Sequence, residues 1–201
     1  MEHGTEMQGK KLEIVKYAFD RFSESGFHAT AMEAALAGSG ISKRTLYKYF
    51  SSKEDLIQAV LKLYSEGVVH ELFDPVAHMS DPREQIVEFF DVRKNPGRML
   101  TRGCLGARAA QEYAGKHQGV VELGIAASSR GETKFFELCK RAGFQKPQRL
   151  AKQLNLILQG ALALSHASGE TSAFLLAKET ASALLEGAPL VKFKQNGGAA
   201  R

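Results

Sequence analysis

One segment, Gly38–Lys53 (GSGISKRTLYKYFSSK), restricts what this chain can fold into more than any other. Gly40 permits a tight turn, because glycine takes up positive φ without steric cost. Ser42 is placed to cap a new helix, since its hydroxyl can accept a first-turn N–H. A short helix over 43–49 follows, with Leu46 facing inward. The segment therefore predicts the second half of a helix-turn-helix.

The polar side of this short helix carries donors and cations suited to phosphates and base edges. Between Ile41 and Lys53 there are four basic residues and no acid, a local charge of +4. A solvated basic helix end is the alternative, but here the turn, the cap and two tyrosines coincide. We therefore predict DNA contact by the outward-pointing residues Ser42, Lys43, Arg44, Thr45, Tyr47, Lys48 and Tyr49.

The remaining sequence is dominated by helical periodicity. Apolar residues recur at spacings of three and four, and no alternating β-branched pattern repeats, which predicts an all-α fold. One helix start is marked by Thr30 and Glu33, which form the T-x-x-E pattern of a capping box. Residues 1–9 and 188–201 are polar and are expected to be flexible. Helices are predicted over residues 10–25, 31–39, 43–49, 53–71, 82–92, 102–113, 120–142, 147–167 and 172–186.

Two structural units are expected, with the boundary between residues 55 and 56. Residues 1–55 would form a three-helix, helix-turn-helix DNA-binding domain. Three helices in about 45 residues are near the limit for an independent core. We therefore expect them to lean on the helix 53–71, which is too long to belong to the head only. Residues 56–201 would form a C-terminal helical bundle.

The last two predicted helices are unusually apolar and carry little charge. They offer more apolar surface than one layer can cover, which favours pairing with a second copy in a four-helix interface. A buried hairpin within a monomer is the alternative. The predicted homodimer interface consists of Leu154, Leu158, Ala161, Leu162, Leu175 and Leu184.

The net charge of +5 does not by itself argue for DNA binding. Residues 1–70 hold nine basic and nine acidic residues, so the argument rests on the local cluster. Two cysteines in 201 residues make no disulfide framework, and the N-terminus lacks an apolar leader. No apolar run reaches the roughly 18 residues of a membrane span. We expect a cytoplasmic protein with no membrane partner.

Catalysis finds no support in the sequence. There is no G-x-S-x-G, H-E-x-x-H, P-loop or dinucleotide-binding motif. The six histidines show no metal-binding spacing. We predict a protein that is not an enzyme and holds no metal or cofactor. A helical interaction module that uses its helix-turn-helix only structurally remains the alternative, and the outward cations argue against it.

Residues 10–56 resemble the DNA-binding head of the TetR family of bacterial one-component repressors. The segment Thr30–Leu56 (TAMEAALAGSGISKRTLYKYFSSKEDL) carries the resemblance. Where the family usually has an acid and a large aliphatic residue before an alanine, this chain has Ala34-Ala35-Leu36. The packing of the head is therefore expected to differ slightly, with the recognition helix intact.

The resemblance implies an all-helical homodimer with a three-helix head and a larger ligand-binding and dimerisation domain. It adds Thr30 and Lys53 to the DNA contacts, both at the phosphate backbone. Two recognition helices about 34–36 Å apart would reach successive major grooves. The DNA partner would then be a near-palindromic operator.

We further expect an unidentified small-molecule effector to enter the bundle over 83–164 and to shift the helix 53–71. The alternatives are that the candidate lining is ordinary core and that the regulator responds to no effector. The candidate lining residues are Phe89, Phe90, Cys104, Leu105, Arg108, Tyr113, His117, Phe136 and Leu158.

Cys104 follows Arg102 at an expected helix start, and both features favour the reactive thiolate. The surrounding R-G-C-L segment resembles a branch of the family in which some members sense electrophiles or oxidants through that cysteine. A small buried hydrophobic residue is the alternative interpretation of Cys104.

Overall fold

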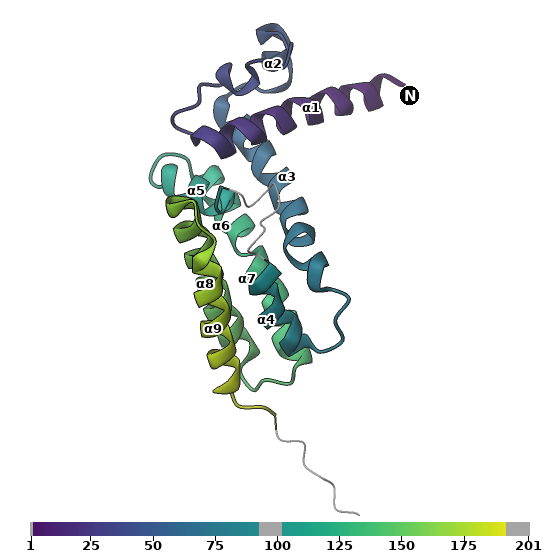
Figure 1. Ribbon diagram of the computed structural model, residues 1–201. Coiled ribbons are helices and arrows are strands. Elements are labelled where there is room, and N and C mark those ends of the chain that lie inside the picture. Colours follow the sequence, from purple (N-terminus) through teal and green to yellow (C-terminus); the bar gives the residue numbers. More distant parts are fainter. Residues whose placement is uncertain (1, 93–101, 192–201) are drawn as a thin grey trace, which may run out of the picture.

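The computed structural model describes residues 2–92 and 102–191, and the regular elements within these ranges are helices. The only strand-like pairing among them is an isolated bridge between Phe144 and Leu190. The predicted all-α fold is confirmed. A small head at one end, formed by the N-terminal helices, sits on a longer helical body (Figure 1).

The head contains α1 (Glu2–Ser25), a 3₁₀ turn η1 (Ala34–Leu36), α2 (Lys43–Tyr49) and the beginning of α3 (Lys53–Phe73). α1 lies across the top of α3, and α2 stands at the free end of the molecule (Figure 1). The apolar faces of these elements meet in one core. Its largest buried side chains are Phe22, Phe27, Ile14, Leu46, Leu56 and Ile57.

The body begins with the lower part of α3 and continues through a second 3₁₀ turn, η2 (Asp74–Val76). The helices that follow are α4 (Pro82–Val92), α5 (Leu105–Glu112), α6 (Gln118–Ser128), α7 (Arg130–Arg141), α8 (Pro147–Ser168) and α9 (Ser172–Glu186). α3 packs against α5, α6 and α7, while α8 packs on α7 and α9, and α9 also packs on α4. α8 and α9 therefore form one outer wall of the bundle (Figure 1).

The two units share α3. Its apolar residues are buried along the whole helix, from Leu56 and Ile57 in the head to Leu72 and Phe73 in the body. The same helix contacts α1 at one end and the body helices at the other. The predicted boundary between residues 55 and 56 therefore falls inside the first turn of a helix that serves both units.

A polar junction also joins head and body. Glu112, the last residue of α5, accepts hydrogen bonds from the backbone N–H groups of Phe27 (3.3 Å) and His28 (2.7 Å) in the turn after α1. Arg108 donates to Glu112 Oε1 (3.1 Å) and to the carbonyl of Ser23 (3.2 Å). The His28 ring stacks on Tyr113, with 5.1 Å between the ring centres. The end of α1 is thus tied to the end of α5.

The predicted second helix over 31–39 is wrong. Only Ala34–Leu36 is helical, as a 3₁₀ turn. The capping box does not form, because the Thr30 hydroxyl donates to the carbonyl of Gly26 (2.8 Å) and the Glu33 side chain makes no capping bond. Ala35 and Leu36 still reach the core, so the segment packs as expected without helical regularity.

The predicted single helix over 120–142 is also wrong, because it breaks at Ser129 between α6 and α7. Neighbouring helices satisfy groups at the break. Gln159 from α8 donates to the carbonyl of Ser128 (3.1 Å), and Arg130 donates to the carbonyl of Ser65 in α3 (3.2 Å). Tertiary hydrogen bonds thus stabilise a break that apolar periodicity does not reveal.

Both termini that were expected to be flexible carry local structure where they are described. α1 already begins at Glu2, so residues 2–9 are helical, while Met1 lies outside the described residues. The chain after α9 pairs with the turn before α8. Gln145 N–H donates to the Pro189 carbonyl (2.9 Å) and Val191 N–H to the Gly143 carbonyl (2.8 Å). Residues 192–201 of the predicted tail are not described.

α5 and α6 approach each other through two glycines, which generates a testable prediction. A Cβ on Gly124 would lie 2.6 Å from the Gly106 carbonyl oxygen and 2.8 Å from the Ala110 nitrogen, both backbone atoms. We expect Gly124→Ala to lower the free energy of unfolding by about 1–3 kcal/mol, because the helices must move apart. Denaturant unfolding would measure the change.

Gly9→Ala is the matched control for this substitution. Gly9 lies within α1, and a Cβ there meets nothing within 4 Å. This substitution should leave stability unchanged or raise it by up to about 1 kcal/mol through helix propensity. Equal effects of the two substitutions would contradict the close-packing argument.

Candidate nucleic-acid interface

The α2 helix forms as the sequence predicts, over Lys43–Tyr49. Ser42 caps it, because its hydroxyl accepts the Thr45 N–H (3.1 Å) and also bonds the Thr45 hydroxyl (2.8 Å). Leu46 is 1% exposed and Phe50 is 4% exposed, so both anchor the helix on the head core. The buried face is therefore fixed, and the opposite face is turned to solvent.

The predicted DNA contacts fall into three groups by exposure. Ser42, Lys43, Arg44, Tyr47 and Lys48 are exposed on α2 or at its cap, and Thr45 and Tyr49 are partly buried. Lys53 is partly buried in the first turn of α3. Thr30 is 5% exposed and its hydroxyl is bonded internally, so the structure does not offer that hydroxyl to DNA.

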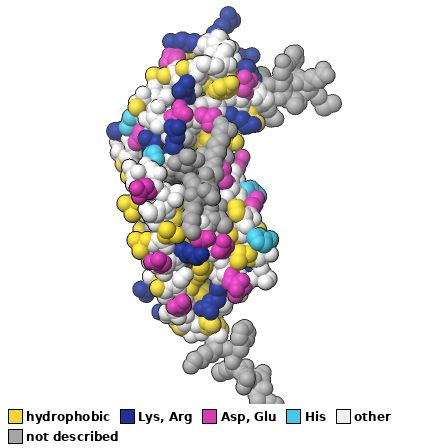
Figure 2. All heavy atoms as spheres, in the orientation of Figure 1, with side chains coloured by type: hydrophobic (Ala, Val, Ile, Leu, Met, Phe, Trp, Pro, Cys, Tyr) yellow, Lys and Arg dark blue, Asp and Glu magenta, His cyan; other side chains and the backbone are white. Residues whose placement is uncertain are grey.

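Cations dominate the α2 surface. Among the described residues, Arg44 and Lys48 have no ion-pair partner, and Lys48 Nζ lies 5.8 Å from the ring centre of Tyr49. Basic side chains lie at the end of the molecule that holds α2, with acidic side chains among them (Figure 2). At that end, the excess of positive charge is confined to the segment from Ile41 to Lys53, which has four basic residues and no acid. This local excess of positive charge is what a phosphate backbone would meet first.

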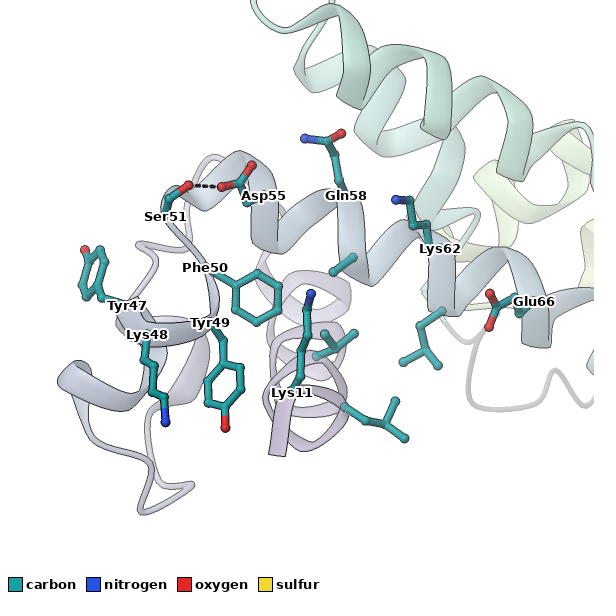
Figure 3. A pocket seen from close by; sticks show the side chains of 14 residues that line it. Lys11, Tyr47, Lys48, Tyr49, Phe50, Ser51, Asp55, Gln58, Lys62 and Glu66 are labelled. Atoms are coloured by element: carbon teal, nitrogen blue, oxygen red, sulfur yellow. Dashed lines mark hydrogen bonds between the residues drawn. The ribbon is translucent and has the colours of Figure 1, made fainter. Parts of the chain in front are cut away.

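A groove of about 730 Å³ lies beside α2, between α1 and α3 (Figure 3). Tyr49, Phe50 and the apolar residues of α1 and α3 contribute to its lining, while Lys11, Lys48 and Lys62 bring positive charge. Ser51, at its edge, donates a hydrogen bond to Asp55. That bond is the main cause of a lowered Asp55 pKa. The groove therefore continues the polar surface of α2 without adding a buried charged group.

One residue at this surface, Glu33, was not assigned to it by the sequence analysis. Glu33, just before η1, points its carboxylate at α2, and Oε1 accepts from both Lys43 Nζ (2.8 Å) and Tyr47 Oη (2.9 Å). These hydrogen bonds, that from Lys43 first, lower the Glu33 pKa from 4.5 to about 2. The only sequence signal at this position was the T-x-x-E pattern, which indicated a helix cap instead.

The candidate effector-lining residues do not come together around one cavity. Phe89 and Phe90 pack with Phe135 in the body core, with ring centres 5.0 and 5.9 Å from it. Arg108 and Tyr113 belong to the junction with the head, and His117 caps α6 through its Nδ1. Leu105 and Leu158 are buried, and Phe136 is partly buried. The alternative interpretation as core fits most of these residues better.

Cys104 lies at a helix start, as predicted. Its sulfur caps α5 by accepting the Ala107 N–H (3.5 Å), and it accepts a hydrogen bond from the buried Tyr64 hydroxyl (3.6 Å). Burial raises the Tyr64 pKa well above its ordinary value, so this phenol stays a donor. Cys104 is partly buried, while Cys139 is fully buried, where burial raises the thiol pKa to about 12.

Four of the six predicted interface residues face their own core. Leu154, Leu158, Ala161 and Leu162 are 0–5% exposed within the protomer, because they pack inside the bundle. The helices α8 and α9 do present an apolar outer face, but it is formed by other residues. Its exposed leucines are Leu156 (74%), Leu164 (62%), Leu175 (46%) and Leu176 (62%). Leu175 is common to both sets, and Leu184 is partly buried.

Comparisons with known proteins agree with this geometry. The sequence profile described as bacterial regulatory proteins, tetR family, matches residues 14–60, which include α2. The HTH-type transcriptional regulator UidR of Escherichia coli is 33% identical over 126 residues, which cover 59% of this chain and 64% of UidR. RutR of the same organism is 45% identical over 56 residues, 28% of this chain and 26% of RutR. Residues 14–60 therefore belong to the TetR family.

Solved structures extend the similarity in fold beyond the head. A TetR-family regulator from Cytophaga hutchinsonii has a TM-score of 0.80 at 15% identity and covers 93% of this chain and 98% of its own. E. coli NemR in its reduced form has a TM-score of 0.76 at 14% identity, covering 90% and 97%. At these identities the likeness shows the fold alone. The sequence match to UidR spans less than two thirds of that relative.

The electrostatics of Glu33 generate a pH prediction. Its pKa is lower in the folded protein than the ordinary 4.5, so its contacts stabilise the fold above about pH 4.5 and this contribution is lost as the pH falls toward 2. We expect Lys43→Ala to return the Glu33 pKa toward 4.5, and Tyr47→Phe to raise it less. Carboxyl NMR titration would measure both, and an unchanged midpoint in Lys43→Ala would contradict the pairing.

Proposed function

We propose that this protein is a ligand-responsive, DNA-binding transcriptional regulator, most simply a repressor that leaves a near-palindromic operator when an effector binds. The exposed cationic face of α2, anchored from behind by Leu46 and Phe50, carries the proposal. A helix of seven residues with only one buried position contributes little to the core. Its exposed donors and cations are suited to a DNA groove.

The residues of this face divide into two roles in the proposal. Arg44, Thr45, Tyr47 and Lys48 would enter the major groove, where arginine and lysine pair with guanine edges. Tyr49, at the end of α2, would support Lys48 at the groove wall. Lys53 and the capped N-terminus of α3 would hold a phosphate, because the helix dipole favours an anion there. Ser42 and Lys43 lie at the entry to the groove.

Removing cations from α2 tests this assignment. We expect Arg44→Ala and Lys48→Ala each to weaken DNA binding through lost base contacts, and Lys53→Ala to reduce the salt dependence as well, by about 0.9 in the log–log slope for the lost phosphate contact. Fluorescence anisotropy across a salt series would measure both. Lys140→Ala, at the exposed end of α7, is the matched control and should change neither. Salt-independent wild-type binding would overturn the proposal.

Sequence selection from a random DNA pool tests the function as a whole. A twofold regulator should enrich two inverted half-sites at a fixed spacing, one or more helical turns apart. A helical interaction module would enrich nothing. Selection of a single half-site without symmetry would retain DNA binding and reject the dimeric operator.

The homodimer forms, in this proposal, through the outer face of α8 and α9. The exposed leucines at 156 and 164 on α8 and at 175 and 176 on α9 are spaced to lie on one side of their helices. Gly160, between the α8 leucines, has open space where a Cβ would be, so a partner helix could approach closely. Two such pairs would bury each other as a four-helix interface.

A charge placed in this face should separate the protomers. We expect Leu164→Glu or Leu176→Glu to produce monomers, because an unpaired carboxylate would be buried between the copies. Sedimentation velocity would measure the oligomeric state. The matched control is Tyr17→Glu, at an exposed position (42%) on α1 of the head. A wild-type monomer at all concentrations would contradict the interface.

Effector response is the finer part of the proposal. If a ligand moved α5 relative to α3, this movement would be transmitted to the head through α3 and through the hydrogen bonds of Glu112. A coupling of about 1–3 kcal/mol between effector and DNA would be enough for regulation. Candidate compounds, electrophiles included, can be titrated against a DNA-shift assay. Loss of the electrophile response in Cys104→Ser alone would assign the sensor, and repression unchanged by any compound would indicate an effector-independent regulator.

A further inference from the structure

An acidic side chain lies among the cations of the proposed DNA-binding face. Glu33 comes from the segment before η1, outside α2, yet its Oε1 atom accepts from Lys43 Nζ at 2.8 Å and from Tyr47 Oη at 2.9 Å. Lys43 Nζ also lies 5.7 Å from the Tyr47 ring centre. The three side chains therefore form one closed cluster, named here the Glu33 cluster.

The cluster is accessible to a large ligand. The side chains of Lys43 and Glu33 are 70% and 41% exposed, and Tyr47 is 45% exposed. A surface ion pair of this kind adds little stability by itself. Its position matters more, because it restrains two side chains that face DNA in the proposed function. Free lysine and tyrosine side chains would otherwise lose rotamer freedom on binding.

The charge of Glu33 affects contacts with DNA phosphates and contacts with base edges differently. A carboxylate beside Lys43 offsets that cation, so a passing phosphate gains less from it and is repelled by Glu33. A base edge carries no net charge and pays no such cost. It meets the remaining N–H donors of Lys43, and the Tyr47 hydroxyl oxygen as an acceptor, in positions that are already fixed. The cluster thus weakens phosphate contacts, which form with DNA of any sequence, more than it weakens contacts with the base edges of a matching sequence.

From this geometry we propose that Glu33 is a positioning residue for operator selectivity: it orders Lys43 and Tyr47 for base contact and weakens non-specific phosphate binding. The inference rests on the proposed DNA-binding function and extends it to a residue outside the recognition helix. The inference predicts that removing this interface side chain should strengthen binding to random DNA, whereas removing an interface side chain usually weakens binding.

The experiment compares Glu33→Gln with wild type on two duplexes of about 30 base pairs, long enough for two half-sites. One carries the sequence enriched from a random pool, and the other is a random-sequence duplex. Glu33→Gln should bind the random duplex about three- to tenfold more tightly, with a log–log salt slope steeper by about 0.9, one more phosphate contact. The ratio of selected to random affinity should fall about tenfold.

Glu13→Gln is the matched control. Glu13 is 42% exposed and pairs with Lys10 at 2.8 Å on α1, so its removal changes the net charge of the head equally. It should raise affinity for both duplexes alike and leave the ratio unchanged. The double variant Glu33→Gln/Lys43→Ala should lose the gain on random DNA, because Lys43 is the cation that Glu33 restrains.

The outcomes separate the two proposals. If Glu33→Gln binds random DNA no more tightly than Glu13→Gln, or keeps the wild-type ratio, the role of Glu33 is rejected while DNA binding stands. If wild type binds neither duplex in a salt-dependent way, the proposed function is rejected with it. Circular dichroism melting of each variant identifies a folding defect, and selectivity retained by a correctly folded Glu33→Gln would overturn the inference.

Discussion

The burial of α3 on both of its ends is the constraint on which the rest of the structure depends. Leu56 and Ile57 close the core of the small head, and Tyr64, Leu72 and Phe73 are buried in the body. Because one continuous helix supplies both cores, the head cannot tilt without disturbing the packing of α5, α6 and α7 on α3. The position of α2 is thereby set by the body as much as by the head.

The distribution of charged side chains on α2, at the free end of the molecule, differs from that on the body. Over the body, charges alternate in sign, which suits a solvated surface (Figure 2). On α2 the cations are left with few partners, and Glu33 is the acid that approaches them most directly. A surface that needed only solubility would not hold donors in fixed positions, so this arrangement supports recognition of a polyanion.

Local sequence patterns predicted the elements whose hydrogen bonds are local. The Ser42 cap, the limits of α2 and the positive φ of Gly40 (72°) all depend on residues close in sequence. The helix expected over 31–39 failed because the Thr30 hydroxyl bonds to Gly26 and Glu33 bonds to α2. These choices depend on tertiary neighbours, which a sequence pattern does not contain.

The same limit applies to the sites in the body. Apolar spacing identified α8 and α9 correctly, but both faces of each helix carry leucines, so the pattern could not tell the inner face from the outer one. The break at Ser129 is stabilised by Gln159 and Arg130 side-chain bonds to carbonyls on other helices. Most of the residues expected to line an effector site are apolar, and apolar residues are also the ones that fill a core.

The Glu112 junction has a consequence for how such a protein can diversify. Its carboxylate holds the turn after α1 by the main-chain N–H groups of residues 27 and 28, which every amino acid except proline provides. Side chains of the head can therefore be exchanged over generations while this attachment to the body persists. During evolution, the DNA sequence that the head recognises could then change while the response of the body to its effector stays the same.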